Sequence, residues 1–195
     1  MNIGMNVNKE LIGNLIVLLA ERCKPLYHTK LLKLLYLIDE ESVKRSGCPI
    51  TWLDYKVWQL GPVAEDVYFS KFEGTNKFAE FISFEAVGEN RIVIRPKVVF
   101  DDGEFSDYDL EIIEEVVKIY GCKNSKALVE VTHTNGSLWC RAKEKAKLHF
   151  SEENKTSDVL IDLQKLVDND NDKKCCYKEM KENLQLKLML LCHSK

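Results

Sequence analysis

The sequence lacks the features that mark several large classes of protein. Its seven cysteines include no C-x-x-C pair, and inspection finds no phosphate-binding loop, H-E-x-x-H motif or G-x-S-x-G motif. A bilayer span needs about 20 consecutive apolar residues, and the most apolar segment, residues 11–20, is far shorter. Disulfide scaffolds, membrane spans and the common enzyme classes are therefore disfavoured. The same absences predict a cytoplasmic protein with reduced thiols, no cofactor and no membrane contact.

The charge balance gives no support to a domain-wide nucleic-acid surface. The chain has 28 basic and 31 acidic side chains, for a formal net charge of -3. Strong non-specific binding to nucleic acid depends on many cations that neutralise phosphates, so we expect no nucleic-acid partner. The overall charge does not exclude a local basic patch. The length of 195 residues and the apolar share of 45% fit one globular domain, or one domain with an appendage.

Apolar side chains recur at helical spacing through much of the chain. The first half of segment 29–46 is apolar on nearly every side, so we expect a central helix with neighbours all around it. Ser106, with Asp109 three residues later, predicts a capped helix start. The predicted helices cover residues 8–23, 29–46, 106–120, 125–131, 136–148, 158–167 and 174–192.

Strand patterns are fewer and shorter. Residues 54–60 alternate weakly and predict a strand or an extended arm, after which Gly61-Pro62 is expected to open a new helix. Residues 78–87 and 91–100 predict a hairpin that turns through residues 88–90. The fold class is therefore α+β: a mainly helical single domain with a small antiparallel β-hairpin or sheet. We expect the domain to cover residues 1–150 and a helical extension to cover residues 151–195.

A search for catalytic residues yields one weak pair. His133 lies seven residues before Cys140, and an imidazole can activate a thiol, so a Cys/His hydrolase is conceivable. The sequence offers no third group to orient the histidine. A histidine that packs at a helix end explains the same residue without chemistry, and we predict no catalytic site.

One acidic run partly matches a calcium-binding loop. Asp168, Asp170, Asp172 and Glu179 occupy positions one, three, five and twelve of such a loop. Lys173, however, stands at the position where the sharp turn calls for glycine. A solvated loop between two helices accounts for the same residues, and we predict no metal site.

The predicted C-terminal helix is amphipathic. Its apolar residues form one stripe that must be covered by something. Packing on the body of the same chain is the default interpretation, and a partner protein or a second copy of the chain is the alternative. The residues of the stripe are Tyr177, Met180, Leu184, Leu188 and Leu191.

Three phrases, read in order, resemble a known family. They are residues 30–37 (KLLKLLYL), residues 55–63 (YKVWQLGPV) and residues 131–139 (VTHTNGSLW). This order and spacing is similar to the Panacea domain, the SocA-like antitoxin family that includes phage-associated GepA-like proteins, over roughly residues 8–150. The chain departs from the family pattern at Leu60, where a tyrosine is typical, and at Leu138, where a proline is typical.

The resemblance implies a non-enzymatic antitoxin of a bacterial or phage toxin-antitoxin system. Such a protein would neutralise a cognate toxin by direct binding, or would deliver the toxin to a cellular protease as an adaptor. The surface around Gly61 and Pro62 is then a second candidate interface, beside the C-terminal stripe. A DNA-binding regulator of its own operon is the main rival. We expect the family-motif residues to support the fold and not to contact a substrate. They are Leu34, Leu35, Tyr36, Trp58, Gly61, Pro62, Val63, Thr132, His133 and Trp139.

Overall fold

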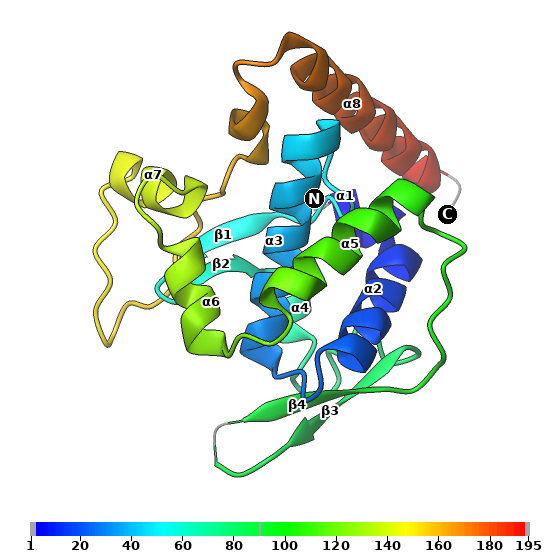
Figure 1. Ribbon diagram of the computed structural model, residues 1–195, viewed down its shortest axis with the longest axis vertical. Coiled ribbons are helices and arrows are strands. Elements are labelled where there is room, and N and C mark those ends of the chain that lie inside the picture. The colour runs from blue at the N-terminus through cyan, green and yellow to red at the C-terminus, as the bar shows by residue number, and fades with distance from the viewer. Residues whose placement is uncertain (1–2, 90, 194–195) are drawn as a thin grey trace.

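A computed structural model describes residues 3–89 and 91–193 of the chain. The fold is mainly helical, with two small antiparallel sheets of two strands each (Figure 1), which confirms the predicted α+β class. The strands are β1 (Tyr55–Trp58), β2 (Gly61–Ala64), β3 (Ile82–Ala86) and β4 (Ile92–Pro96). The helices are α1 (Ile3–Val7), α2 (Lys9–Arg22), α3 (His28–Ser46), α4 (Glu65–Phe69), α5 (Asp107–Tyr120), α6 (Ser125–Thr132), α7 (Leu138–Lys145), the 3-10 helix η1 (Leu163–Val167) and α8 (Asn171–His193).

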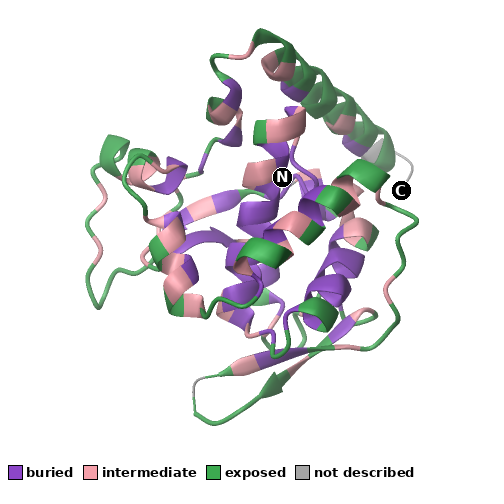
Figure 2. Ribbon diagram, viewed as in Figure 1, coloured by how far each residue is buried: buried purple, intermediate pink, exposed green. Residues whose placement is uncertain are grey.

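Helix α3 is the axis of the molecule, as its apolar sequence predicts. It contacts α4, α5, α6, α8, η1, β2 and β4, and it is buried along most of its length (Figure 2). The helix ends at Gly47, whose φ of 88° is a left-handed conformation that glycine adopts without strain. A central helix that is buried along most of its length has to bury some polar side chains too, and each of them needs a partner.

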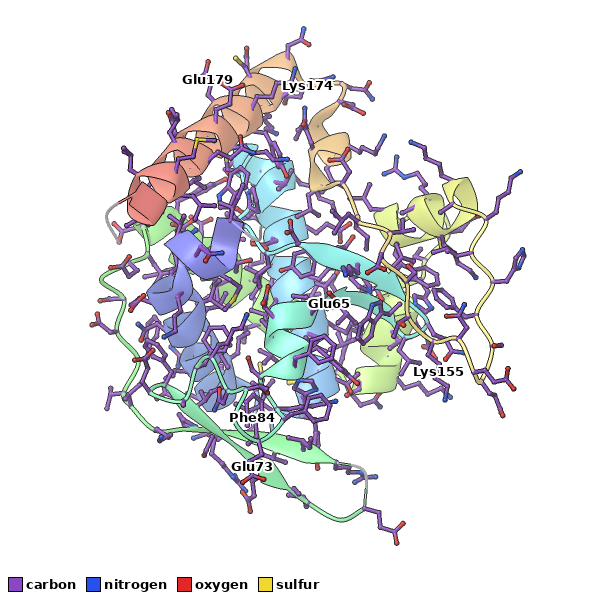
Figure 3. All side chains as sticks on the ribbon, turned by 180° about the vertical axis from the view of Figure 1, so that it is seen from behind. Glu65, Glu73, Phe84, Lys155, Lys174 and Glu179 are labelled. Carbon is purple, nitrogen blue, oxygen red and sulfur yellow. The ribbon has the colours of Figure 1, made fainter. Side chains whose placement is uncertain are left out.

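The prediction of a helix opening at Gly61-Pro62 is wrong. Gly61–Ala64 is a strand that pairs antiparallel with β1, with Trp58 opposite Gly61 and Val57 opposite Pro62. Proline is tolerated there because β2 is an edge strand, which pairs with β1 on one side. The helix begins at Glu65, so Glu65 and the residue after it still occupy the first turn. Figure 3 shows Glu65 on α4, which from this side lies in front of α3.

The remaining elements follow the sequence with shifted boundaries. The hairpin of β3 and β4 is confirmed, over shorter strands than predicted, and Ser106 forms the predicted capping box with Asp109 at the start of α5. Of the helix expected over residues 158–167, only η1 exists. The residues before it are extended because they pair with β1: the Val57 amide donates to Val159 O at 2.9 Å, and the Ile161 amide donates to Tyr55 O at 2.8 Å.

Helix α8 packs lengthwise on the body and begins three residues earlier than predicted. The Tyr177 ring contacts the Trp52 ring at a centroid distance of 5.1 Å, and Lys173 Nζ donates to the carbonyl of Lys44 at 2.8 Å. Leu184 packs against the core and Leu188 is buried. The opposite side of the helix is exposed in Figure 2. No helix in residues 3–89 or 91–193 combines the length and apolarity of a membrane span.

A buried carboxylate on α3 holds the segment that leads to β1. Asp39 is fully buried and accepts hydrogen bonds from the Thr51 amide at 2.8 Å, from the Tyr55 hydroxyl at 2.8 Å and from the Thr51 hydroxyl. Burial raises the pKa of Asp39 to about 6, against the opposite effect of these donors. The three hydrogen bonds fix residues 51–55 on the helix axis and thereby set the start of the β1–β2 hairpin.

Replacement of Asp39 by alanine should strongly destabilise the fold. It leaves buried donors of Thr51 and Tyr55 without an acceptor, and each such donor costs about 1–3 kcal/mol. We expect Asp39→Ala to lower the free energy of unfolding by about 3 kcal/mol or more, measured by urea denaturation followed by circular dichroism. Lys44→Ala, at an exposed position of α3, is the control and should change stability by less than about 0.5 kcal/mol. Equal effects of the two variants would contradict this role of Asp39.

Candidate functional site

The β1–β2 turn rests on a buried lysine of α3. Lys33 is 1% exposed, and its Nζ donates to the carbonyl of Pro62 at 2.7 Å. Gly61 has a φ of +99°, and a Cβ at this position would lie 2.7 Å from Thr132 Oγ1 and 3.1 Å from Lys33 Nζ. Only glycine therefore lets the turn approach α3 and α6 so closely. Burial lowers the pKa of Lys33 to about 7.

Two aromatic rings connect α7 to the same turn. The His133 ring stacks on Trp139 at a centroid distance of 3.7 Å, and Trp139 Nε1 donates to the carbonyl of Trp58 at 3.0 Å. Burial, together with the nearby charges of Lys33 and Lys143, lowers the pKa of His133 to about 4. The imidazole is therefore neutral near pH 7, which suits a ring that stacks inside the protein.

The structure brings most of the family-motif residues to one junction beside α3. Trp58, Gly61, Pro62, Thr132, His133 and Trp139 meet there, while Leu34, Leu35, Tyr36 and Val63 lie in the surrounding core. Sequence reasoning did not identify Lys33 as a member. The sequence does contain an indication of this role. Lys33 is the second lysine in the leucine-rich segment 30–37, and a helix that is apolar on nearly every side has to bury it.

The His133 and Cys140 side chains do not form a catalytic pair. The Cys140 thiol donates to the backbone carbonyl of His133 at 3.2 Å, and the imidazole faces Trp139. His133 Nε2 is buried and has no hydrogen-bond partner among the described residues. A hydrolase mechanism needs the imidazole to accept the thiol proton, and this arrangement does not provide that contact.

The acidic residues of the partial calcium loop are also kept apart. Asp168 pairs with Lys174 at 3.1 Å and Asp170 pairs with Lys173 at 3.5 Å. Asp172 stands in the first turn of α8, and Glu179 lies about two turns further along that helix. Figure 3 shows Glu179 on the outer side of α8. Within residues 3–89 and 91–193, no group of three or more potential ligands is arranged to hold a metal ion.

Aromatic side chains form a half-exposed surface next to the β1–β2 turn, which we name the aromatic patch. It consists of Trp58, Tyr68, Phe69 and Phe72, in a chain of ring contacts with centroid distances from 4.7 to 6.4 Å. Phe69 is 45% exposed and Phe72 is 49% exposed. Lys71 Nζ lies 3.8 Å from the Tyr68 ring centroid and gives the patch a cationic edge.

The C-terminal stripe is divided between the body and solvent. Tyr177 and Leu188 are buried and Leu184 is partly buried against the core, whereas Met180 is 42% exposed and Leu191 is 45% exposed. Intramolecular packing thus covers one part of the stripe. The other part stays accessible for a contact outside the chain.

The buried charge of Lys33 predicts a dependence of stability on pH. The unfolded lysine titrates near about pH 10.4, so between pH 7 and that value the unfolded chain binds more protons and stability increases as the pH rises. From about pH 7 to about pH 9.5, the wild-type free energy of unfolding should gain about 3 kcal/mol more than that of Lys33→Met. Urea denaturation at each pH measures this difference, and parallel curves for the two proteins would contradict a lowered pKa of Lys33 in the folded chain.

Comparison with known families agrees with the geometry of this junction. A family model described as "Antitoxin SocA-like, Panacea domain" matches residues 31–140, which include most of α3, the β1–β2 turn, α6 and the start of α7. The comparisons with curated proteins and with solved structures give no match. The matched segment covers more than half of the chain and contains the residues that meet beside Lys33. The chain therefore belongs to the SocA-like antitoxin family of Panacea-domain proteins.

Proposed function

We propose that this chain is a cytoplasmic antitoxin that neutralises a cognate toxin protein by binding it directly. The observation that supports the proposal is the aromatic patch, which exposes about half of the Phe69 and Phe72 side chains beside the β1–β2 turn. Membership of the antitoxin family supplies the class of partner. The toxin would carry an apolar pocket for these rings, with acidic groups at the rim to face Lys71.

The patch has the properties of an energetic centre in a protein interface. Aromatic residues dominate binding energies when a partner removes them from water. Here the backbone of Trp58 accepts a hydrogen bond from Trp139, and Lys33 holds the neighbouring β1–β2 turn through the carbonyl of Pro62. A partner therefore meets an ordered surface, and little conformational entropy is lost when the complex forms.

Removal of the two exposed rings should abolish neutralisation without unfolding the protein. The double variant Phe69→Ser/Phe72→Ser should bind the co-encoded toxin at least about 100-fold more weakly, because hot-spot residues contribute about 2 kcal/mol or more each. Calorimetry measures the affinity, and growth of cells that express the toxin measures neutralisation. Val98→Ser/Val99→Ser is the matched control, since these valines are 42% and 85% exposed and lie outside the patch. Wild-type affinity of the phenylalanine variant would contradict the assignment of the interface.

The exposed part of α8 is the second candidate surface for the same toxin. Met180→Ser/Leu191→Ser should leave the free energy of unfolding within about 0.5 kcal/mol of the wild type and weaken toxin binding about tenfold. Leu188→Ser, on the buried side of the helix, should instead lower stability by about 2 kcal/mol. If the first variant binds toxin normally, α8 serves only to stabilise the body.

Direct binding and delivery to a protease predict different amounts of toxin in the cell. A directly binding antitoxin restores growth while the toxin persists in the cell at an undiminished level. An adaptor restores growth only as the toxin disappears through proteolysis. Immunoblots of the toxin at the time of growth recovery distinguish the two routes, and we expect persistence.

A further inference from the structure

A basic pocket opens at the amino-terminal end of α3, next to the Lys71 edge of the aromatic patch. It has a volume of about 770 Å³ and lies between the α2–α3 connection, the start of β4 and the α5–α6 loop. These segments come together at the lower end of α3 in Figure 1, near the β3–β4 hairpin. Seven lysines and arginines line the pocket, and no aspartate or glutamate is among its described lining residues. A chain with a net charge of -3 thus concentrates a quarter of its 28 cations around one cavity.

One of these cations is buried without a carboxylate partner. Lys30 is 7% exposed, and its Nζ donates to the backbone carbonyl of Gly121 at 2.5 Å. An ammonium group has three donors, and no described carboxylate forms an ion pair with Lys30 within 4.0 Å. A buried charge is normally compensated by an opposite charge. At Lys30 the protein supplies a carbonyl dipole alone, and the side chain borders an open cavity.

The other cations leave most of their charge available to the cavity. Among the cations that line the pocket, Arg22 alone forms an ion pair within the described residues, with Glu114 at 3.0 Å. Lys71 lies over the Tyr68 ring, and the Arg91 guanidinium lies 6.0 Å from the Tyr27 ring centroid. Lys123 and Lys126 are exposed on the opposite wall. Like charges held this close repel one another, and a bound anion would relieve that repulsion.

Two helix starts reinforce the positive potential. Helices α3 and α6 both begin at the wall of the pocket, and neither has an acidic residue in its first turn. Tyr27, the residue that precedes α3, forms no side-chain hydrogen bond with the first-turn amides. The amino-terminal end of a helix carries partial positive charge, which suits a phosphate group. At α6 the Asn124 side chain already accepts a hydrogen bond from the Ala127 amide at 2.9 Å, so α3 is the helix that offers first-turn amides without a side-chain cap.

From this cavity and its buried, uncompensated lysine we infer that the pocket binds a small ligand with adjacent phosphate groups, an oligophosphate such as inorganic triphosphate or the phosphate chain of a nucleotide. Lys30 binds one phosphate at the base, while Lys123 and Lys126 contact the outer phosphates. The cations are gathered around one cavity, which favours a small ligand, because a nucleic-acid backbone needs an extended basic stripe. Lys71 lies at the border between this pocket and the aromatic patch, but Lys30, Lys123 and Lys126 lie outside the patch, and the inference does not depend on the proposed toxin interface.

Isothermal titration calorimetry on the full chain at physiological salt tests the site. The probes are sodium triphosphate, ATP, and a single-stranded and a duplex oligonucleotide. We expect triphosphate and ATP to bind, with an affinity that decreases as salt increases. Lys30→Met and Lys123→Gln/Lys126→Gln should each weaken triphosphate binding at least about tenfold, because charge-assisted hydrogen bonds are lost. Circular dichroism verifies that both variants fold. The double variant is expected to fold normally because Lys123 and Lys126 are exposed.

The matched control removes the same charge elsewhere. Lys145→Gln/Lys178→Gln changes two exposed lysines that lie outside the pocket, and it should bind triphosphate like the wild type. An equal loss in the control would show that net charge alone drives binding, and the inference would be wrong. It would also be wrong if triphosphate and ATP gave no heat at about 1 mM. Tight binding of the oligonucleotides without binding of triphosphate would assign the pocket to a nucleic-acid surface instead.

Discussion

The architecture depends on polar side chains of the central helix α3 that are buried and need partners inside the protein. Lys30, Lys33 and Asp39 all lie on α3 with at most 7% of their surface exposed. Such groups are costly inside a protein unless they are hydrogen-bonded. Each therefore binds a different segment that wraps the helix: Lys30 the α5–α6 loop, Lys33 the β1–β2 hairpin and Asp39 the residues before β1. The polar residues of the core thus determine where the outer segments lie.

This constraint links the core to the surfaces that we assign to function. The hairpin is held by Lys33, and the strand that follows its turn leads directly into α4, which carries Phe69 of the aromatic patch. Helix α8 adds a further face through the contact between Tyr177 and Trp52. The apolar core and its polar contacts make a rigid support, whereas recognition belongs to side chains that α3 does not bury. The proposed binding of a toxin uses this division, because the rings of Phe69 and Phe72 remain exposed for contact.

The sequence predicts the helices well because their apolar periodicity is local. The central position of α3, its end at Gly47 and the capping box at Ser106 all follow from short patterns. The errors occur where distant residues decide. Pro62 is compatible with a helix start, but its contact with Lys33, which is remote in sequence, places it in a strand. Residues 158–161 have a helical pattern and are nevertheless extended, because the backbone of β1 offers them hydrogen bonds. The sequence alone does not indicate the aromatic patch, because the exposure of Phe69 and Phe72 depends on how α4 packs in the folded chain.

Hydrogen-deuterium exchange of the chain, alone and with its co-encoded toxin, tests the central claim most directly. The account predicts that toxin binding slows exchange in residues 58–72, and in α8 if that helix contributes, while exchange within α3 stays unchanged because its amides are already protected. Slower exchange confined to other segments, or no change in any segment at saturating toxin, would contradict the view that a rigid core presents the aromatic patch to a protein partner.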